Sequence, residues 1–126
     1  MSLRDVTAAV LTDEQGRALL CRRPPDKRCG NLWEFPGGKL EPGETLFRCL
    51  ERECAEELDI VIAPQEELAA VESGGFLIHY IRCTTVSGQP VLREHTELAW
   101  LLPTEMQPDT MCPADAQFLR EWLLRQ

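Results

Sequence analysis

The sequence lacks the segments that direct a chain into or across a membrane. No apolar run approaches the ~18 residues of a membrane span, and no basic stretch followed by an apolar one opens the chain. The six cysteines form no CxxC pair and no zinc-type spacing with histidine. We therefore expect a cytoplasmic protein with reduced thiols and no membrane partner.

Basic residues are also in deficit. Thirteen lysines and arginines stand against 21 aspartates and glutamates, which gives a net charge of −8. Non-specific affinity for long nucleic acid grows with the number of phosphates that cations neutralise, so no stable DNA or RNA complex is expected. A small phosphate-bearing partner complexed with metal fits this balance better, although an acidic surface also serves solubility.

Internal repeats, low-complexity segments and long linkers are absent from the sequence as well. At 126 residues the chain has the length of one domain, able to bury roughly two thirds of its unfolded surface. We expect a single domain over residues 1–126. The sequence leaves both a monomer and a homodimer open.

Apolar periodicity and turn residues predict the order of the elements. In chain order they are strands at 6–12 and 18–22, a helix at 46–58, strands at 68–73 and 76–85, a strand at 98–102 and a helix at 114–124. Gly16 and the pair Gly74–Gly75 predict two hairpins. Strands on both sides of one helix, closed by another, predict an α+β (α/β) fold with a mixed β-sheet sandwiched between α-helices.

Three glutamates share one face of the 46–58 helix. Glu53 precedes Glu56 by three residues and Glu57 by four, so their carboxylates converge at a cost of roughly 0.2–0.5 kcal/mol per pair. A bound cation would turn this repulsion into ligation. Because the donors are all oxygens, they favour Mg²⁺, with Mn²⁺ as a substitute. A solvated helix face is the alternative, but the helix is entered through a glycine-rich turn around Gly37 and Gly38, which suits close approach to a ligand.

The segment from Gly38 to Ile60 resembles the Nudix box, G-x5-E-x7-R-E-U-x-E-E-x-G-U, where U is a bulky aliphatic residue. Every charged position matches. Cys54 replaces an aliphatic residue, which we expect to be mild because cysteine packs as a small hydrophobe. Asp59 replaces the glycine that ends the helix, and we expect an altered helix exit with an intact metal site.

The flanks of the box resemble the MutT-type branch of that family. The similarity lies in Arg22 and Arg23, in residues 31–39 and in the stretch Pro113–Asp115. This resemblance implies the Nudix fold and hydrolysis of nucleoside triphosphates to monophosphates and pyrophosphate, in the service of sanitising 8-oxo-dGTP or modified CTP and dCTP. Because Asp115 stands where a site selective for oxidised guanine more often has asparagine, a cytidine-type or damaged pyrimidine substrate stays open.

The metal and catalytic candidates follow from the helix and the resemblance together. Helix geometry nominates Glu53, Glu56 and Glu57 as metal ligands, and the resemblance adds the Gly37 carbonyl and a loop carboxylate, for which Glu94 competes with Glu97. Glu53 or Glu94 would be the general base. Two further residues, Arg52 and Glu44, complete the catalytic set. Arg52 would orient the glutamates through a two-pronged hydrogen bond, and Glu44 would either cap the helix or support the metal site.

The substrate-binding candidates each have a structural alternative. Arg23 and Lys39 would bind the substrate phosphates or, alternatively, be surface residues without a role in binding. Phe35 would stack on the base or belong to the core, and Asp115 would bind the base edge or cap the last helix. Gly38 would offer its backbone. His79 and His95 are interpreted as bystanders.

Two other functions remain compatible with the sequence. One is a Nudix hydrolase of a different diphosphate-linked substrate, such as a nucleotide sugar, a dinucleotide or a capped RNA. The other is a non-catalytic module that binds nucleotides. The short chain argues against the first, and the intact glutamates argue against the second.

Overall fold

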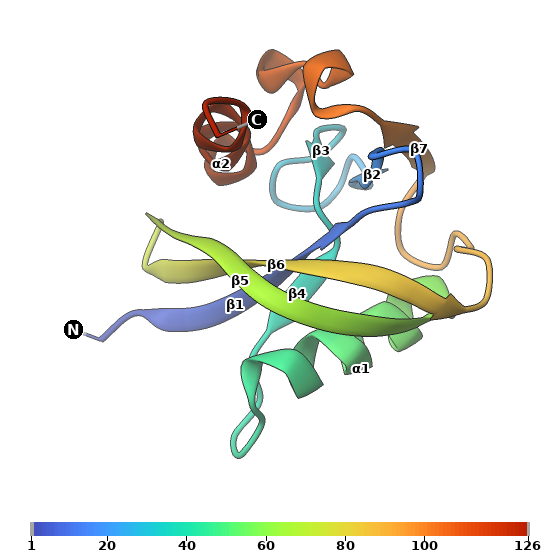
Figure 1. The fold of residues 1–126 in the computed structure, drawn as a ribbon. Coiled ribbons are helices and arrows are strands. Elements are labelled where there is room, and N and C mark those ends of the chain that lie inside the picture. Colours follow the sequence, from blue (N-terminus) through green and yellow to red (C-terminus); the bar gives the residue numbers. More distant parts are fainter. Residues whose placement is uncertain (1, 126) are drawn as a thin grey trace.

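The N-terminal strand β1 lies inside a four-stranded mixed sheet with the order β4-β1-β6-β5. A computed structural model describes residues 2–125 of the chain. Strand β1 pairs in parallel with β6 and antiparallel with β4, and β5 pairs antiparallel with β6 (Figure 1). The bounds of these strands are β1 Arg4–Leu11, β4 Gly37–Lys39, β5 Val61–Ser73 and β6 Phe76–Ser87.

A second, antiparallel sheet contains β3 (Trp33–Glu34), β2 (Ala18–Arg22) and β7 (Glu97–Leu101), in that order. The expected turn between β1 and β2 is present, with Gly16 at φ 78°. The hairpin prediction is nevertheless wrong for the strands, which share only an isolated bridge between Thr12 and Ala18. Each strand finds its ladder partners in a different sheet, and side-chain packing in common apolar clusters holds the two sheets together.

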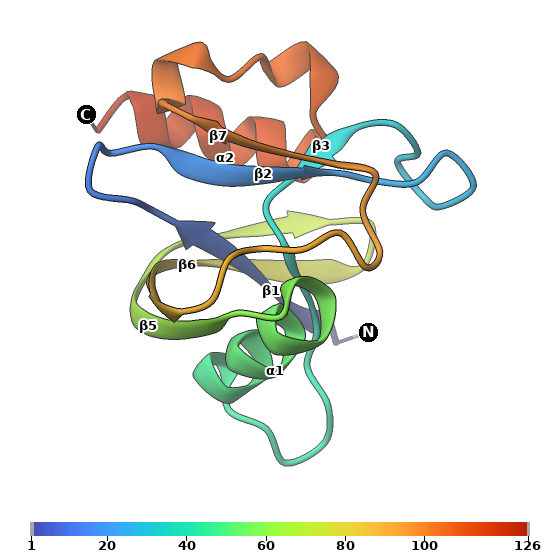
Figure 2. The same cartoon turned by 90° about the vertical axis from the view of Figure 1, so that its right-hand side faces the viewer.

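Alternating side chains along β1 divide the core into two layers. Ala8 and Val10 pack in the cluster that includes Phe118 of α2 (Pro113–Leu123), whereas Ala9 and Leu11 pack with Leu50 of α1 (Leu46–Leu58). The helices therefore cover opposite sides of the strands (Figures 1 and 2). This arrangement confirms the predicted α+β class, with the strands divided between two sheets. Short 3₁₀ helices at Pro103–Glu105 and Pro108–Thr110 lead into α2.

Most element bounds agree with the sequence patterns. Helix α1 has the predicted limits, and β7 and α2 are each displaced by one residue. Strand β5 begins at Val61, seven residues earlier than predicted, because its first half carries Pro64 and charged side chains that weaken the strand pattern. An edge strand with register shifts tolerates such residues, since proline need not donate to a neighbour there.

All six cysteines are free thiols in this structure. Within residues 2–125, no helix is long and apolar enough to span a membrane.

The exit of α1 corrects the expectation about Asp59. This residue adopts the left-handed conformation itself, with φ 57° and ψ 40°, and its N–H donates to the Ala55 carbonyl. The helix thus ends as it would with glycine, and no altered exit is present. Aspartate is among the few side chains that enter this region at moderate cost.

Replacing Asp59 with glycine is expected to raise the free energy of unfolding by about 1 kcal/mol, because glycine has no Cβ to strain the left-handed position. Urea unfolding measures the change. The matched control is Asp59→Ala, which keeps the strain and, like the glycine variant, loses the exposed contact of Asp59 with Arg93 at 3.4 Å. Equal stability of the two variants would contradict the conformational explanation.

Candidate active site

Two glycines bring the backbone of β4 unusually close to its neighbours. A Cβ on Gly37 would lie 2.0 Å from the Thr7 backbone oxygen, and one on Gly38 would lie 2.3–2.6 Å from the carboxylate atoms of Glu53. Neither position can carry a side chain without movement of these groups. The glycine-rich turn therefore lets the Glu53 carboxylate pack directly against the strand.

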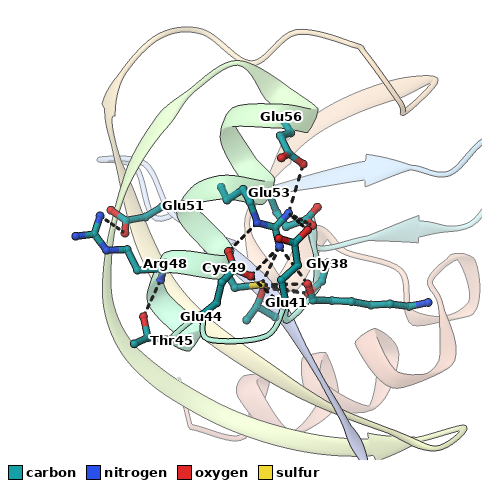
Figure 3. Close-up of polar contacts among 12 residues, drawn as sticks. Gly38, Glu41, Glu44, Thr45, Arg48, Cys49, Glu51, Glu53 and Glu56 are labelled. Atoms are coloured by element: carbon teal, nitrogen blue, oxygen red, sulfur yellow. Dashed lines mark hydrogen bonds and ion pairs between the residues drawn. The ribbon is translucent and has the colours of Figure 1, made fainter.

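Arg52 joins the turn to the helix through contacts with Glu44 and Glu53, both of which are labelled in Figure 3. Its Nε and Nη2 donate to the two carboxylate oxygens of Glu44 at 2.7 and 2.9 Å, and its Nη1 donates to Glu53 at 2.8 Å. A longer contact of 3.4 Å reaches Glu56. The two-pronged geometry expected for Arg52 is thus present, and its main recipient is Glu44. The hydrogen bonds from Arg52 lower the pKa of Glu44 to about 2.

Glu44 does not cap α1. The N-cap is Thr45, whose hydroxyl accepts from the Arg48 N–H at 3.2 Å. Glu44 instead accepts from the Glu41 N–H at 2.9 Å while it holds Arg52. Because the Thr45 hydroxyl caps the first turn of α1, the Glu44 carboxylate is available to bind Arg52 in the middle of the helix.

Glu53 and Glu57 of α1 are partly buried acids that lie close together, whereas Glu56 on the same face is exposed. Oε1 of Glu57 is buried and has no hydrogen-bond partner among the described residues. Burial raises the pKa of Glu57 to about 8, and the charges of Glu53, Glu34 and Glu94 add to the shift. Burial likewise raises the pKa of Glu53, against the opposing hydrogen bond from Arg52. An unpaired buried oxygen among oxygen donors is what a divalent cation would complete, so these residues fit such an ion.

The loop before β7 distinguishes the two candidates for the additional carboxylate. The negative charge of Glu94 acts on both Glu53 and Glu57, which places it beside the cluster. Glu97 instead receives a hydrogen bond from Arg22 at 2.8 Å across the β2–β7 pair. The structure therefore favours Glu94 over Glu97.

A cavity of about 540 Å³ opens beside the cluster. All five predicted substrate-binding residues line it, namely Arg23, Phe35, Gly38, Lys39 and Asp115. The volume is within the range of small-ligand sites. Gly38 lines this wall and also contacts Glu53, so the cavity borders the acidic cluster.

The ring of Phe35 occupies the core position that was its alternative. It is 3% exposed and packs edge-on against Tyr80 and Phe118, with centroid distances of 6.0 and 5.5 Å. Phe76, which sequence reasoning did not nominate, is the less buried aromatic on the cavity wall. Arg28 and Lys39 approach its ring at 5.6 and 5.5 Å. No local signal marks Phe76, because only the sheet brings it to this wall.

Asp115 lies inside the first turn of α2 and does not cap it. Cys112 is the N-cap, without a side-chain cap bond. The Asp115 carboxylate accepts from the Phe35 N–H at 3.0 Å and from the Tyr80 hydroxyl at 2.5 Å. Burial raises its pKa to about 7; the Tyr80 hydrogen bond opposes this shift and the charge of Glu34 adds to it. The carboxyl is thus poised between donor and acceptor at neutral pH.

The model for the NUDIX domain matches residues 2–122. This chain belongs to the NUDIX family. It is 33% identical to the CTP pyrophosphohydrolase of Escherichia coli over 98% of this chain and 93% of that protein. It is also 33% identical to the putative 8-oxo-dGTP diphosphatase 2 of Mycobacterium tuberculosis, over 80% of this chain and 71% of that protein. The solution structure of the E. coli ORF135 protein superposes with a TM-score of 0.79, at 33% identity, over 98% of this chain and 91% of that one.

As a NUDIX hydrolase, the chain is an enzyme of a family that acts on small nucleotide substrates with divalent metal ions. Among the positions of this NUDIX site, sequence reasoning missed Glu34. Its Oε1 accepts from Arg23 at 2.9 Å, and its Oε2 lies 2.9 Å from Nε2 of His95.

His95 was interpreted as a bystander, yet it is the one buried side chain of the loop 88–96, at 7% exposure. Its contact with Glu34 fastens the loop that carries Glu94 to the strand beside the cavity. The one sequence signal for this contact was Glu34, an acidic residue between the aromatic residues Trp33 and Phe35.

Replacing Glu57 with glutamine is expected to stabilise the metal-free NUDIX domain by about 1 kcal/mol at neutral pH, because the Glu57 carboxyl, with its raised pKa, takes up a proton on folding and glutamine does not. Adding Mg²⁺ should stabilise the wild type and have less effect on the variant, since only ions bound to the folded state raise stability. Urea unfolding with chelator and with Mg²⁺ measures both effects. Glu51→Gln, on the same helix, is the control and should change neither; a Glu57 variant less stable than the wild type in chelator would refute the prediction.

The raised pKa of Asp115 predicts a pH dependence of stability. The folded state holds this proton more tightly than the unfolded state, so its contribution is complete below about pH 4 and is lost as pH rises to about 7. The wild type should therefore lose more unfolding free energy than Asp115→Asn between about pH 5 and pH 8. Denaturant titrations at both pH values test this, and parallel curves for the two proteins would exclude it.

Proposed function

We propose that this chain is a Mg²⁺-dependent pyrophosphohydrolase that cleaves a nucleoside or deoxynucleoside triphosphate to the monophosphate and pyrophosphate. The observation that carries the proposal is the continuity at Gly38 between a cluster of oxygen donors and a cavity of nucleotide size. Residues 1–126 would act as one domain, as a monomer or homodimer, without nucleic-acid or membrane partners. The six free thiols support a cytoplasmic location.

The metal ligands in this proposal are the Gly37 carbonyl and the carboxylates of Glu53, Glu56, Glu57 and Glu94. Mg²⁺, or Mn²⁺ in its place, would supply neutralisation of phosphate charge and acidification of water. Glu53 is the candidate base, since it is held against Gly38 and its pKa is raised, which makes it a better proton acceptor; Glu94 is the alternative. Arg52 and Glu44 keep Glu53 in place through their shared hydrogen bonds.

Cations on the cavity wall would bind the phosphates. Arg23, Arg28 and Lys39 all line the cavity, although the chain as a whole has a charge of −8. This local reversal of sign would draw an anionic substrate toward the site. Arg23 is itself oriented by its ion pair with Glu34.

The nucleobase of the substrate would lie at the end of the cavity that contains Asp115. A carboxyl with a pKa of about 7 can either donate to or accept from a base edge, which suits modified bases with altered hydrogen-bonding groups. The named relatives, a CTP pyrophosphohydrolase and a putative 8-oxo-dGTP diphosphatase, indicate the same range of substrates. We therefore propose modified CTP or dCTP and 8-oxo-dGTP as candidate substrates in nucleotide sanitation.

The test is pyrophosphate release from a panel of normal and oxidised nucleoside triphosphates, with Mg²⁺, Mn²⁺ or chelator. Metal-dependent release is expected, and the fastest substrate identifies the base. If only nucleotide sugars, dinucleotides or capped RNA are cleaved, the family assignment stands and the proposed substrate class fails. Binding of triphosphates without turnover would make the chain a nucleotide-binding module.

Glu53→Gln is expected to reduce turnover at least about 100-fold while the fold is retained, because the variant loses both a ligand and the candidate base. Steady-state kinetics and circular dichroism measure the two effects. Glu51→Gln should keep wild-type kinetics. Near-full activity of the Glu53 variant would refute the metal assignment.

Phe76→Ala is expected to raise KM several-fold with little change in kcat, since the ring lies on the cavity wall between two cations. Phe35→Ala should instead lower stability by about 3–5 kcal/mol, as for a buried aromatic residue. Kinetics and thermal unfolding of both variants separate the roles. A Phe76 variant with unchanged KM would exclude this ring from the binding site.

A further inference from the structure

The first half of the loop 88–96 is fastened to the last turn of α1. The Val91 N–H donates to the Leu58 carbonyl at 3.0 Å. Nη1 of Arg93 donates to the Glu56 carbonyl at 3.4 Å. This part of the loop therefore follows the helix that carries most of the proposed metal ligands.

The second half of the loop is fastened to the neighbouring sheet. The Thr96 N–H donates to the Arg22 carbonyl at 3.0 Å. Nε2 of His95 lies 2.9 Å from Oε2 of Glu34, and because an ionised carboxylate only accepts, Nε2 donates this hydrogen bond. Glu94 thus lies between an anchor on the helix and an anchor on the strands β2 and β3.

His95 is poorly suited to a purely structural role. Its side chain is buried, yet Nδ1 has no hydrogen-bond partner among the described residues. An unpaired buried polar atom destabilises a fold, so an apolar side chain of similar size would pack there at less cost. A residue that breaks this rule is expected where function requires it. The hydrogen bond to Glu34 is what a leucine could not supply.

The other histidine of the chain has different surroundings. The ring nitrogens of His79 lie 2.8 Å from Asp5 and 3.1 Å from Glu67, so both of them have partners. These contacts join β6 to its two neighbours in the sheet, β1 and β5. His79 is therefore placed to stabilise the sheet, in contrast to His95.

Glu34 uses both of its carboxylate oxygens. Oε1 accepts from Nη1 of Arg23 at 2.9 Å, while Oε2 accepts from His95. Because Arg23 lines the cavity, this carboxylate links the cavity wall to the loop. Removing the imidazole alone would release the loop and still leave Glu34 paired with Arg23.

We propose that His95, held by Glu34, is a positioning residue that fixes Glu94 beside the acidic residues of α1 and thereby raises the affinity of the site for a divalent ion. His95 binds no ion itself. Its role rests on the proposed function, in which Glu94 is a metal ligand. The two anchors restrict the loop before the ion arrives, so less conformational entropy is lost when Glu94 binds it.

The experiment measures Mn²⁺ binding to the full chain from the electron paramagnetic resonance signal of the free ion. His95→Leu is expected to bind Mn²⁺ about tenfold more weakly than the wild type, because residues that orient metal ligands contribute a factor of this order. His95→Gln should recover most of the affinity, since its amide N–H can replace the Nε2–H. This readout needs no turnover, so it is independent of the substrate class.

Stability separates positioning from a structural role. In urea with chelator, His95→Leu should unfold near the wild-type midpoint, because the loss of the hydrogen bond is offset by the loss of the unpaired Nδ1. His79→Leu is the matched control: it should unfold at a lower urea concentration and keep the wild-type affinity for Mn²⁺. If His95→Leu does not fold, His95→Asn replaces it, because its shorter amide does not extend to Glu34.

Glu94→Gln distinguishes a failure of the positioning role from a failure of the ligand assignment. It is expected to weaken Mn²⁺ binding at least as much as His95→Leu does. If Glu94→Gln binds Mn²⁺ as the wild type does, or if the wild type binds none, the ligand assignment is wrong and the role of His95 is wrong with it. If Glu94→Gln weakens binding and His95→Leu does not, only the positioning role is overturned.

Discussion

The close approach of the Glu53 carboxylate to the backbone of Gly38 is the constraint on which the rest of the site depends. It holds the acidic face of α1 against β4, and β4 in turn is paired with β1 inside the sheet. Arg52 keeps the contact closed by binding Glu44 from the turn and Glu53 from the helix. Because Gly38 also lines the cavity, one backbone position fixes how closely the Glu53 carboxylate approaches the cavity wall.

The structure gathers carboxylate groups whose charge and hydrogen-bonding capacity the described side chains offset only in part. The carboxylates of Glu53 and Glu57 are partly buried beside one another, and Glu57 retains an oxygen without a partner. Arg52 and Arg23 flank this group and offset part of its charge, but neither hydrogen bonds to that oxygen. This arrangement lowers the free energy of unfolding of the ion-free protein. A divalent ion bound to the folded state would relieve the same cost and so raise stability.

Local features of the fold and site follow from patterns in the sequence, whereas the long-range grouping of Arg23 with Asp115 in one cavity was predicted only through the family resemblance. The bounds of α1 and the grouping of Glu53 with Glu57 follow from helical spacing alone. Asp59 was misjudged because the backbone preference of one residue yields to the packing of a whole helix. The exposure of Phe76 depends on which strands pair, and the contact of His95 with Glu34 joins segments 61 positions apart. No pattern within a short window carries such information.

The parallel pairing of β1 with β6 has a consequence for the order in which the molecule assembles. Arg4 pairs with Phe76 and Leu11 with Cys83, so the central ladder joins two strands that lie some seventy residues apart in the sequence. Without β6, β1 has only the short β4 as a ladder partner within its sheet. A ladder between segments so far apart in the sequence forms more slowly than a local hairpin, because the chain between the two strands must first be brought together.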